Sequence, residues 1–173
     1  DYVNGRDKPS IAAVIEPRKL KSSMDKFFWG SEPILVPIIN DIDKGLKQFS
    51  EVKHIISFSS FRSAYESTMT FLDYEQIVSI TVIAEGIPER YARVFNEKAR
   101  KLKKLIIGPA TVGGIKPGCL RIGNTCGSIE NIIDSKLYRQ GNVAFVTRSG
   151  GLLNELCNIV SKKTNGVYQG ISI

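Results

Sequence analysis

The chain has 173 residues, of which 42% are hydrophobic and 24% charged, and it carries a formal net charge of +7 at pH 7. This composition excludes a disordered chain, and no uncharged apolar run approaches the roughly 20 residues that a membrane-spanning helix needs. The positive charge suits an anionic partner, whether nucleic acid, a membrane surface or a phosphorylated small molecule. Because the sequence starts at Asp1 without Met or an apolar signal segment, we expect a piece of a longer protein.

Short apolar segments of strand character alternate with helical patterns along the chain. In order, the expected strands are 10–15, 34–38, 53–58, 79–84, 105–107, 143–147 and 167–173. The expected helices are 41–49, 64–72, 89–104 and 151–163. Such alternation is typical of parallel strands joined by right-handed crossovers, so we predict a doubly wound α/β fold with helices on both faces of the sheet.

The alternation is interrupted after Gly108-Pro109. From there to about Gly127 the sequence is rich in Gly, Pro and Thr, and strand–helix alternation resumes only near Val143. We therefore predict a domain boundary near residue 109. The second unit, 110–173, contains only two expected strands, so we expect it to be incomplete as given.

Ligands of open α/β sheets bind beyond the carboxyl ends of the strands, where loops lead into helices. One such junction, 57–63, combines serine hydroxyls with the aromatic rings of Phe58 and Phe61 and the cation of Arg62. These groups suit a ligand that has an aromatic base and phosphates. The alternative is structural, with Ser63 as the helix N-cap and Phe58 in the core.

A second junction, Arg148-Ser149-Gly150-Gly151, follows an expected strand and precedes an expected helix. Two glycines allow close approach of a ligand to free amides, so the junction could hold a carboxylate or phosphate. A tight turn with Ser149 as cap explains the pattern equally well. The glycine spacing at 113–118 does not make a P-loop, because the required Lys and Ser/Thr are absent from the positions that follow.

Cysteine and histidine usage gives no metal or nucleophile signature. The chain has three cysteines, an odd number that favours a reducing compartment such as the cytosol. With one histidine and no Cys-x-x-Cys pair, it lacks the usual ligand set of a structural zinc site. We interpret His54 as structural and Cys157 as a core residue on the apolar side of the last helix. Cys119 and Cys126 lie in the glycine-rich segment without a recognisable activating neighbour.

The segment 90–104 holds seven cations at helical spacing among apolar residues. A solvated helix face packed on a sheet explains this pattern. A nucleic-acid-binding helix is the alternative, but no RNA-binding signature, zinc finger or basic zipper accompanies it.

Several motifs occur together in one order: SAYESTM at 63–69, IAEGIPE at 83–89, IGPATVGGIKPGC at 107–119, SKLYR at 135–139 and RSGG at 148–151. They resemble the ATP-citrate lyase family of eukaryotes, in the portion similar to the α subunit of succinyl-CoA synthetase. The equivalent piece of a citryl-CoA or succinyl-CoA synthetase subunit is the alternative within the same superfamily.

The resemblance implies a Rossmann-like CoA-binding domain at 1–109, followed at 110–173 by the start of a flavodoxin-like α/β domain. By the same resemblance, the CoA nucleotide would be held by Phe58, Ser60, Arg62 and Ser63, with Ile83, Ala84 and Glu85 lining the same groove. Citrate or citryl-phosphate would meet the helix N-terminus at Ser149, Gly150 and Gly151.

The family converts citrate, ATP and CoA to acetyl-CoA, oxaloacetate, ADP and phosphate. The resemblance thus implies a cytoplasmic, homotetrameric transferase of acetyl-CoA and lipid biosynthesis, with other domains of the same polypeptide as partners and neither nucleic acid nor membrane among them. ATP and Mg²⁺ would bind outside these residues. The family's catalytic histidine would lie beyond Ile173, so we expect no catalytic residue in this piece and no activity from it alone.

One segment departs from the family. After the first strand the family has an aromatic-Thr-Gly loop that touches CoA, whereas this chain has a basic segment without glycine at 17–23. The residues that usually make this contact are therefore missing, and Arg18, Lys19 or Lys21 could meet a CoA phosphate instead.

Overall fold

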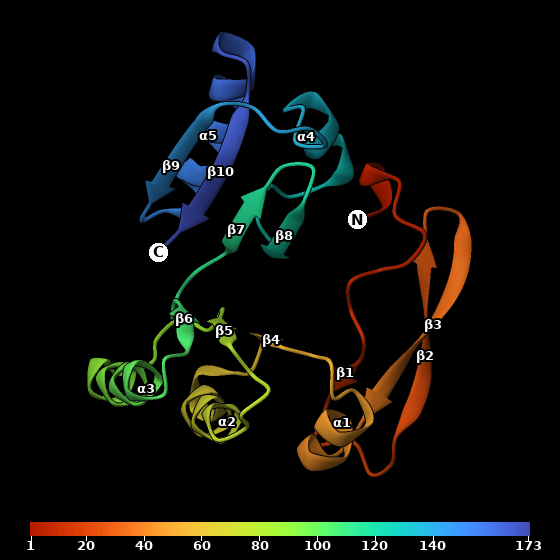
Figure 1. Ribbon diagram of the computed structural model, residues 1–173, viewed down its shortest axis with the longest axis vertical. Coiled ribbons are helices and arrows are strands. Elements are labelled where there is room, and N and C mark those ends of the chain that lie inside the picture. Colours follow the sequence, from red (N-terminus) through yellow and green to blue (C-terminus); the bar gives the residue numbers. More distant parts are fainter. The chain divides into compact units, whose positions relative to one another are not determined.

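The computed structural model describes the backbone of residues 1–173 and every side chain except that of Asn4. The chain divides into two compact units, Asp1–Val52 and Lys53–Ile173 (Figure 1). Among the described residues, no helix is both long and apolar enough to span a membrane.

The first unit is built on a β-hairpin, drawn in orange in Figure 1. Its elements are a short 3₁₀ helix at Tyr2–Asn4, β1 at Val14–Ile15, β2 at Ser23–Trp29, β3 at Glu32–Ile39 and α1 at Ile42–Gln48. The sheet order is β1-β3-β2, with β2 antiparallel and β1 parallel to β3. Gly30 makes the hairpin turn at a φ of 62°, a conformation that favours glycine. Tyr2 packs edge-to-face against Trp29 with ring centroids 5.7 Å apart.

The prediction that strands and helices alternate strictly is wrong for this unit. β2 was not expected, because most of its side chains are exposed and the segment shows no clear period of two. Backbone pairing with β3 defines this edge strand. The first expected strand, 10–15, shortens to Val14–Ile15, whereas α1 forms close to its expected bounds with the Asp41 carboxylate accepting from Lys44 N at 2.7 Å.

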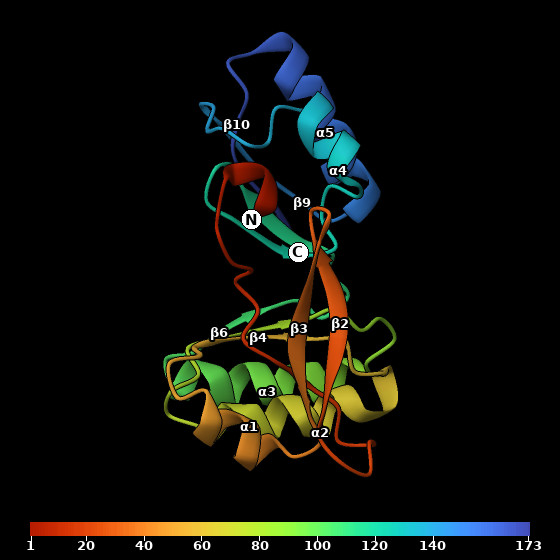
Figure 2. The same ribbon diagram turned by 90° about the vertical axis from the view of Figure 1, so that its right-hand side faces the viewer.

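The second unit opens with a three-stranded parallel sheet in the order β4-β5-β6. Its strands are β4 at His54–Ser57, β5 at Ser79–Val82 and β6 at Leu105–Ile107; its helices are α2 at Phe61–Leu72 and α3 at Glu89–Lys101. All four residues of β5 are buried, as expected of a central parallel strand. Parallel strands in sequential order with crossovers of one hand place both helices on one face, and Figure 2 shows α2 and α3 on the same side of β4 and β6. The predicted α/β class is confirmed, whereas at this sheet α2 and α3 lie on one face and not on both faces as expected.

Helices α2 and α3 are joined by side chains at both ends of their contact. The rings of Tyr65 and Tyr91 stack with centroids 4.5 Å apart. Lys98 Nζ lies 2.6 Å from the Asp73 carboxylate, and Lys104 Nζ donates to the carbonyl of Leu72 at 2.8 Å. Burial lowers the pKa of Lys104. These contacts use part of the cationic segment to join the helices, which supports the interpretation of a packed helix face.

Helix α3 ends in a Schellman motif formed without glycine. The amide of Lys104 donates to the carbonyl of Ala99 at 2.8 Å, and that of Lys103 donates to Arg100 at 3.2 Å. Lys103 takes the left-handed conformation that the motif requires, with a φ of 56°. The turn therefore directs the chain into β6 at a cost in backbone energy.

A mixed four-stranded sheet forms the rest of the second unit, in the order β8-β7-β10-β9. Its elements are β7 at Gly113–Lys116, β8 at Leu120–Gly123, α4 at Ile129–Asp134, β9 at Val143–Thr147, α5 at Gly150–Lys163 and β10 at Val167–Ser172. β9 and β10 are parallel, as predicted, whereas β7 is antiparallel to both β10 and β8. The segment expected to be irregular thus contains an unpredicted hairpin.

The stretch from Gly108 to Thr111 connects the two sheets of this unit. A Cβ on Gly108 would lie 2.4 Å from the carbonyl oxygen of Val82, so only glycine fits there. Thr111 Oγ1 donates to the carbonyl of Ser172 in β10. The predicted boundary near residue 109 separates two sheets inside one compact unit, and as a domain boundary it stays a prediction.

Candidate functional site

The carboxyl ends of β4 and β5 lie side by side. Ser57 pairs with Val82 in the parallel register, and the amide of Ile83 donates to the carbonyl of Ser57 at 3.0 Å. The two loops that leave these strands, 58–60 and 83–88, therefore start from neighbouring positions. The two groups of residues that the family resemblance assigns to CoA, 58–63 and 83–85, therefore follow neighbouring strand ends.

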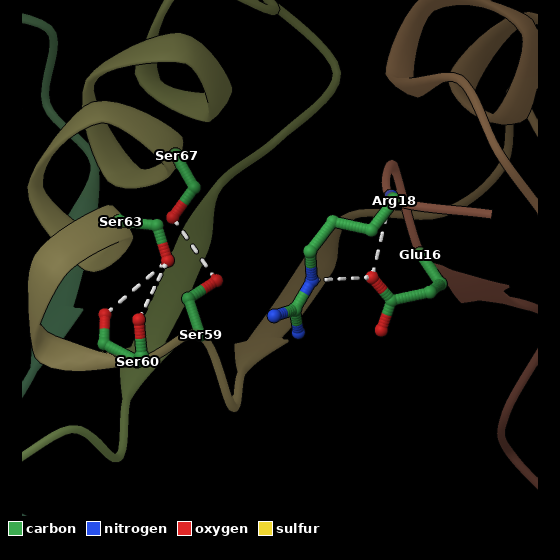
Figure 3. A network of polar contacts seen from close by, with 6 residues as sticks. All are labelled: Glu16, Arg18, Ser59, Ser60, Ser63 and Ser67. Atoms are coloured by element: carbon green, nitrogen blue, oxygen red, sulfur yellow. Dashed lines mark hydrogen bonds and ion pairs between the residues drawn. The ribbon is translucent and has the colours of Figure 1, made fainter.

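Four serines surround the start of α2 (Figure 3). The helix begins at Phe61 with Ser60 in the N-cap position, so the prediction of Ser63 as cap is wrong. Ser60 makes no side-chain cap bond to a helix amide; its hydroxyl lies 3.1 Å from that of Ser63. Ser67 Oγ donates to Ser59 Oγ at 3.2 Å. Ser63 Oγ also donates to the carbonyl of Ser60 at 3.4 Å, and Ser67 Oγ donates to that of Ala64 at 3.2 Å. The hydroxyls thus bond to one another and to carbonyls, and the Ser60 hydroxyl caps no amide of the first turn.

The first amides of α2 consequently remain open. Ser63 N and Ala64 N donate to the carbonyl of Ser60, whereas the amides of Phe61 and Arg62 have no hydrogen bond within the described part of the chain. Open amides at a helix N-terminus carry partial positive charge and favour anions.

Two exposed aromatic rings and one cation complete this cluster. Phe58 is 68% exposed and Phe61 50%, so the alternative that Phe58 belongs to the core is wrong. The Arg62 guanidinium lies over the Phe61 ring at 5.4 Å and forms no ion pair among the described side chains. Chemically, the cluster offers a stacking surface, a permanent positive charge and two amide donors to one ligand.

The loop after β5 forms the neighbouring side of the cluster. Ile83 and Ala84 are half-buried, and Glu85 is exposed. The carbonyl of Ala84 accepts from Ala110 N at 2.9 Å, which ties this loop to the chain that leaves β6. Its backbone is therefore held in position before any ligand is present.

The second predicted site lies at the start of α5. Ser149 Oγ accepts from Leu152 N at 3.3 Å, so Ser149 is a helix cap. The amides of Gly150 and Gly151 have no hydrogen bond among the described residues. The cap and the anion site are compatible, because the serine hydroxyl satisfies a different amide from those that a ligand would use.

The basic segment after β1 is engaged within the first unit. Arg18 Nε donates to Glu16 Oε1 at 3.2 Å, the pair drawn in Figure 3, and Lys19 Nζ lies 3.2 Å from Asp25. The hydrogen bonds from Arg18 lower the pKa of the Glu16 carboxyl. Contact of Arg18, Lys19 or Lys21 with a CoA phosphate stays a prediction.

His54 and the cysteines take the positions that their patterns suggested, with one exception. His54 opens β4, is exposed and places Nδ1 2.8 Å from Ser79 Oγ, a contact between neighbouring strands. Cys157 is buried in the core of the mixed sheet, as predicted. Cys126 is also buried there, which the glycine-rich sequence around it did not indicate.

Together, fold and site define an α/β protein with open helix N-termini at the carboxyl ends of its strands, the arrangement by which this class binds anionic ligands. No protein-family model matches the chain. All 173 residues align with the ATP-citrate synthase of Bos taurus at 52% identity and with a probable ATP-citrate synthase subunit 1 of Schizosaccharomyces pombe at 50%. The chain spans 16% and 28% of the length of these two relatives.

A solved ATP citrate lyase from Methanothrix soehngenii, in complex with citrate and coenzyme A, superimposes on 99% of the chain with a TM-score of 0.95 and 49% identity. The matched region is 28% of that structure. This chain is therefore related over its whole length to one segment of the ATP-citrate lyases, and the family resemblance expected from its motifs is confirmed.

Proposed function

We propose that the chain binds CoA as a segment of an ATP-citrate lyase, with the nucleotide at the carboxyl ends of β4 and β5. The observation that carries this proposal is the start of α2, where two open amides and the unpaired Arg62 lie beside exposed aromatic rings. The relative from Methanothrix soehngenii, solved with citrate and coenzyme A, supports the choice of ligand.

Each predicted residue has a chemical role in this proposal. Phe58 offers a face for the adenine base, and Arg62 with the first amides of α2 neutralises a phosphate. Ser60 and Ser63 exchange their mutual hydrogen bond for bonds to the ligand. Ile83 and Ala84 line the groove, while the Glu85 carboxylate accepts from a hydroxyl or amide of CoA.

The start of α5 is the proposed position for citrate or citryl-phosphate. Ser149 fixes the first turn, and the amides of Gly150 and Gly151 face the anion. Gly151 has open space at its Cα, which leaves room for a ligand.

The parent protein would convert citrate, ATP and CoA to acetyl-CoA, oxaloacetate, ADP and phosphate. In this proposal it is a cytoplasmic, homotetrameric transferase of lipid biosynthesis, and other parts of its polypeptide bind ATP and Mg²⁺. The chain alone would be inactive, because its one histidine, His54, contacts Ser79 between two strands and lies outside both proposed ligand positions.

Calorimetric titration of the chain with CoA tests the proposal, with 3′-dephospho-CoA and ADP as comparison ligands at low and moderate salt. We expect saturable CoA binding that weakens without the 3′-phosphate and persists at moderate salt. Absence of binding at millimolar CoA, or equal binding of all three ligands that disappears with salt, would contradict a specific CoA site.

A further inference from the structure

Two thiols face each other in the core of the mixed sheet. Cys126 Sγ lies 3.6 Å from Cys157 Sγ, and the two residues are 2% and 1% exposed. Cys126 belongs to the turn before α4, and Cys157 lies in the middle of α5. The amide of Cys126 donates to Asn154 Oδ1 at 2.9 Å, one turn before Cys157 on the same helix. This hydrogen bond fixes the turn against α5 and keeps the thiols together.

The thiols also line a cavity of about 400 Å³ between α4 and α5. Its remaining lining is mainly polar and includes Asn131, Asp134, Asn154, Glu155, Asn158 and Lys162. The cavity therefore places a small polar solute next to two thiols that are almost completely buried.

The two thiols differ in acidity. The hydrogen bond between the two thiols holds the pKa of Cys157 below the ordinary cysteine value. The same hydrogen bond, together with burial, raises the pKa of Cys126. Thiolate is the nucleophilic form, so Cys157 is the thiol that reacts first.

We propose that Cys126 and Cys157 form a redox-active dithiol, which a hydroperoxide entering the cavity between α4 and α5 converts to an intramolecular disulfide. The Cys157 thiolate attacks one oxygen of the hydroperoxide, breaks the O–O bond and becomes a sulfenic acid, while an alkoxide or hydroxide ion leaves. Cys126 then attacks the Cys157 sulfur, forming the S–S bond and releasing the sulfenic oxygen as water. Two thiols are oxidised by two electrons, and one hydroperoxide is reduced.

The disulfide would tether the segment before α4 to α5. α4 has only six residues; five of them are exposed, and Ile132 packs, partly buried, against the core around the thiols. A covalent link at Cys126, two residues before the N-cap Ser128, restricts its opening. We therefore expect oxidation to slow amide hydrogen exchange in α4, whereas exchange in α3 should stay unchanged.

The experiment treats the chain with hydrogen peroxide, blocks remaining thiols with an alkylating reagent under denaturing conditions and maps the peptides by mass spectrometry. We expect two of the three thiols to be consumed, a chain lighter by two hydrogen atoms and a linked peptide that joins Cys126 to Cys157. The Cys119→Ser variant is the matched control and should form the same link, because Cys119 is exposed in the β7–β8 turn. The Cys157→Ser variant should form no link.

Mapping of the unaltered chain decides the proposal even if a core variant does not fold. Full alkylation of Cys126 and Cys157 after peroxide treatment, or a link that involves Cys119 instead, would overturn it. A link between two chains, revealed by non-reducing electrophoresis, would overturn it equally.

Discussion

Val112 occupies the space in which a side chain on Gly150 would stand: a Cβ added at Gly150 would lie 2.5 Å from Val112 Cγ1. Val112 follows the stretch that joins the two sheets of the second unit, and Gly150 is the first residue of α5. The start of this helix therefore fits closely against the connection between the sheets.

We expect Gly150→Ala to destabilise the chain by about 1–3 kcal/mol, the usual cost of overpacking, since Val112 or the helix end must move. Urea denaturation monitored by circular dichroism measures this effect. Gly151→Ala is the matched control, because its Cβ would meet nothing closer than Ser149 Oγ at 4.0 Å. Adding Val112→Ala to Gly150→Ala should cost less than the sum of the single changes; simple additivity would show that the two residues do not compete for space.

Arg62→Ala should weaken CoA binding about 10- to 100-fold, because a charge-assisted phosphate contact is worth roughly 1.5–3 kcal/mol. Ser60→Ala removes a neutral hydroxyl worth about 1 kcal/mol and should weaken binding only about five-fold. Calorimetry with CoA compares them. Arg100→Ala, which removes an exposed cation from the last turn of α3, controls for the change in net charge. Equal losses in all three variants would place Arg62 away from the phosphates.

Thr68→Val should stabilise the chain by about 1 kcal/mol. Thr68 is completely buried in α2, and its hydroxyl has no hydrogen-bond partner among the described residues, so the isosteric methyl group removes a desolvation cost. Thr70→Val is the control, since the exposed Thr70 hydroxyl donates to the backbone carbonyl of Glu66 at 2.9 Å and its loss should bring no gain in stability. Urea midpoints of the two variants test the difference, and a destabilised Thr68→Val chain would indicate that this hydroxyl is hydrogen-bonded.

Lys103→Gly should stabilise the chain by about 0.5–1 kcal/mol. The residue has a φ of 56° at the end of α3, where glycine avoids the steric cost of a side chain but adds entropy to the unfolded state. Thermal and urea unfolding both measure the gain. Lys101→Gly is the contrasting change. Lys101 is the last residue inside the helix, so glycine there should make the chain less stable. A loss in both variants would argue against the left-handed end of α3.

Sequence patterns predicted those strands and helices whose burial leaves a regular pattern of apolar residues in the sequence. All residues of β5 are buried, and α3 and α5 keep an apolar side, so the positions of these elements agreed with expectation within a few residues. β2 and β7 were missed for physical reasons. β2 is an edge strand with exposed side chains on both faces, and β7 begins with two glycines at a close approach of backbones. Pairing partners, rather than local preference, define both strands.

The candidate site was predictable as a location and less so in its details. The rule that ligands lie at strand carboxyl ends identified the segment around Arg62, and the family resemblance added the loop at Ile83. The helix start was wrong by three residues because Ser60 and Ser63 are both acceptable caps by residue type. Contact between Cys126 and Cys157 was not accessible from the sequence, since the two residues are far apart in the chain and meet only through packing of α5.

Placement of the only tryptophan determines how the two compact units can be observed separately. Trp29 lies in the first unit against Tyr2, and the second unit contains tyrosines but no tryptophan. Indole emission therefore follows the melting of residues 1–52 alone, while far-ultraviolet dichroism follows helices of both units. A single chain, without any label, thus reports two unfolding midpoints whenever its units lose structure at different temperatures.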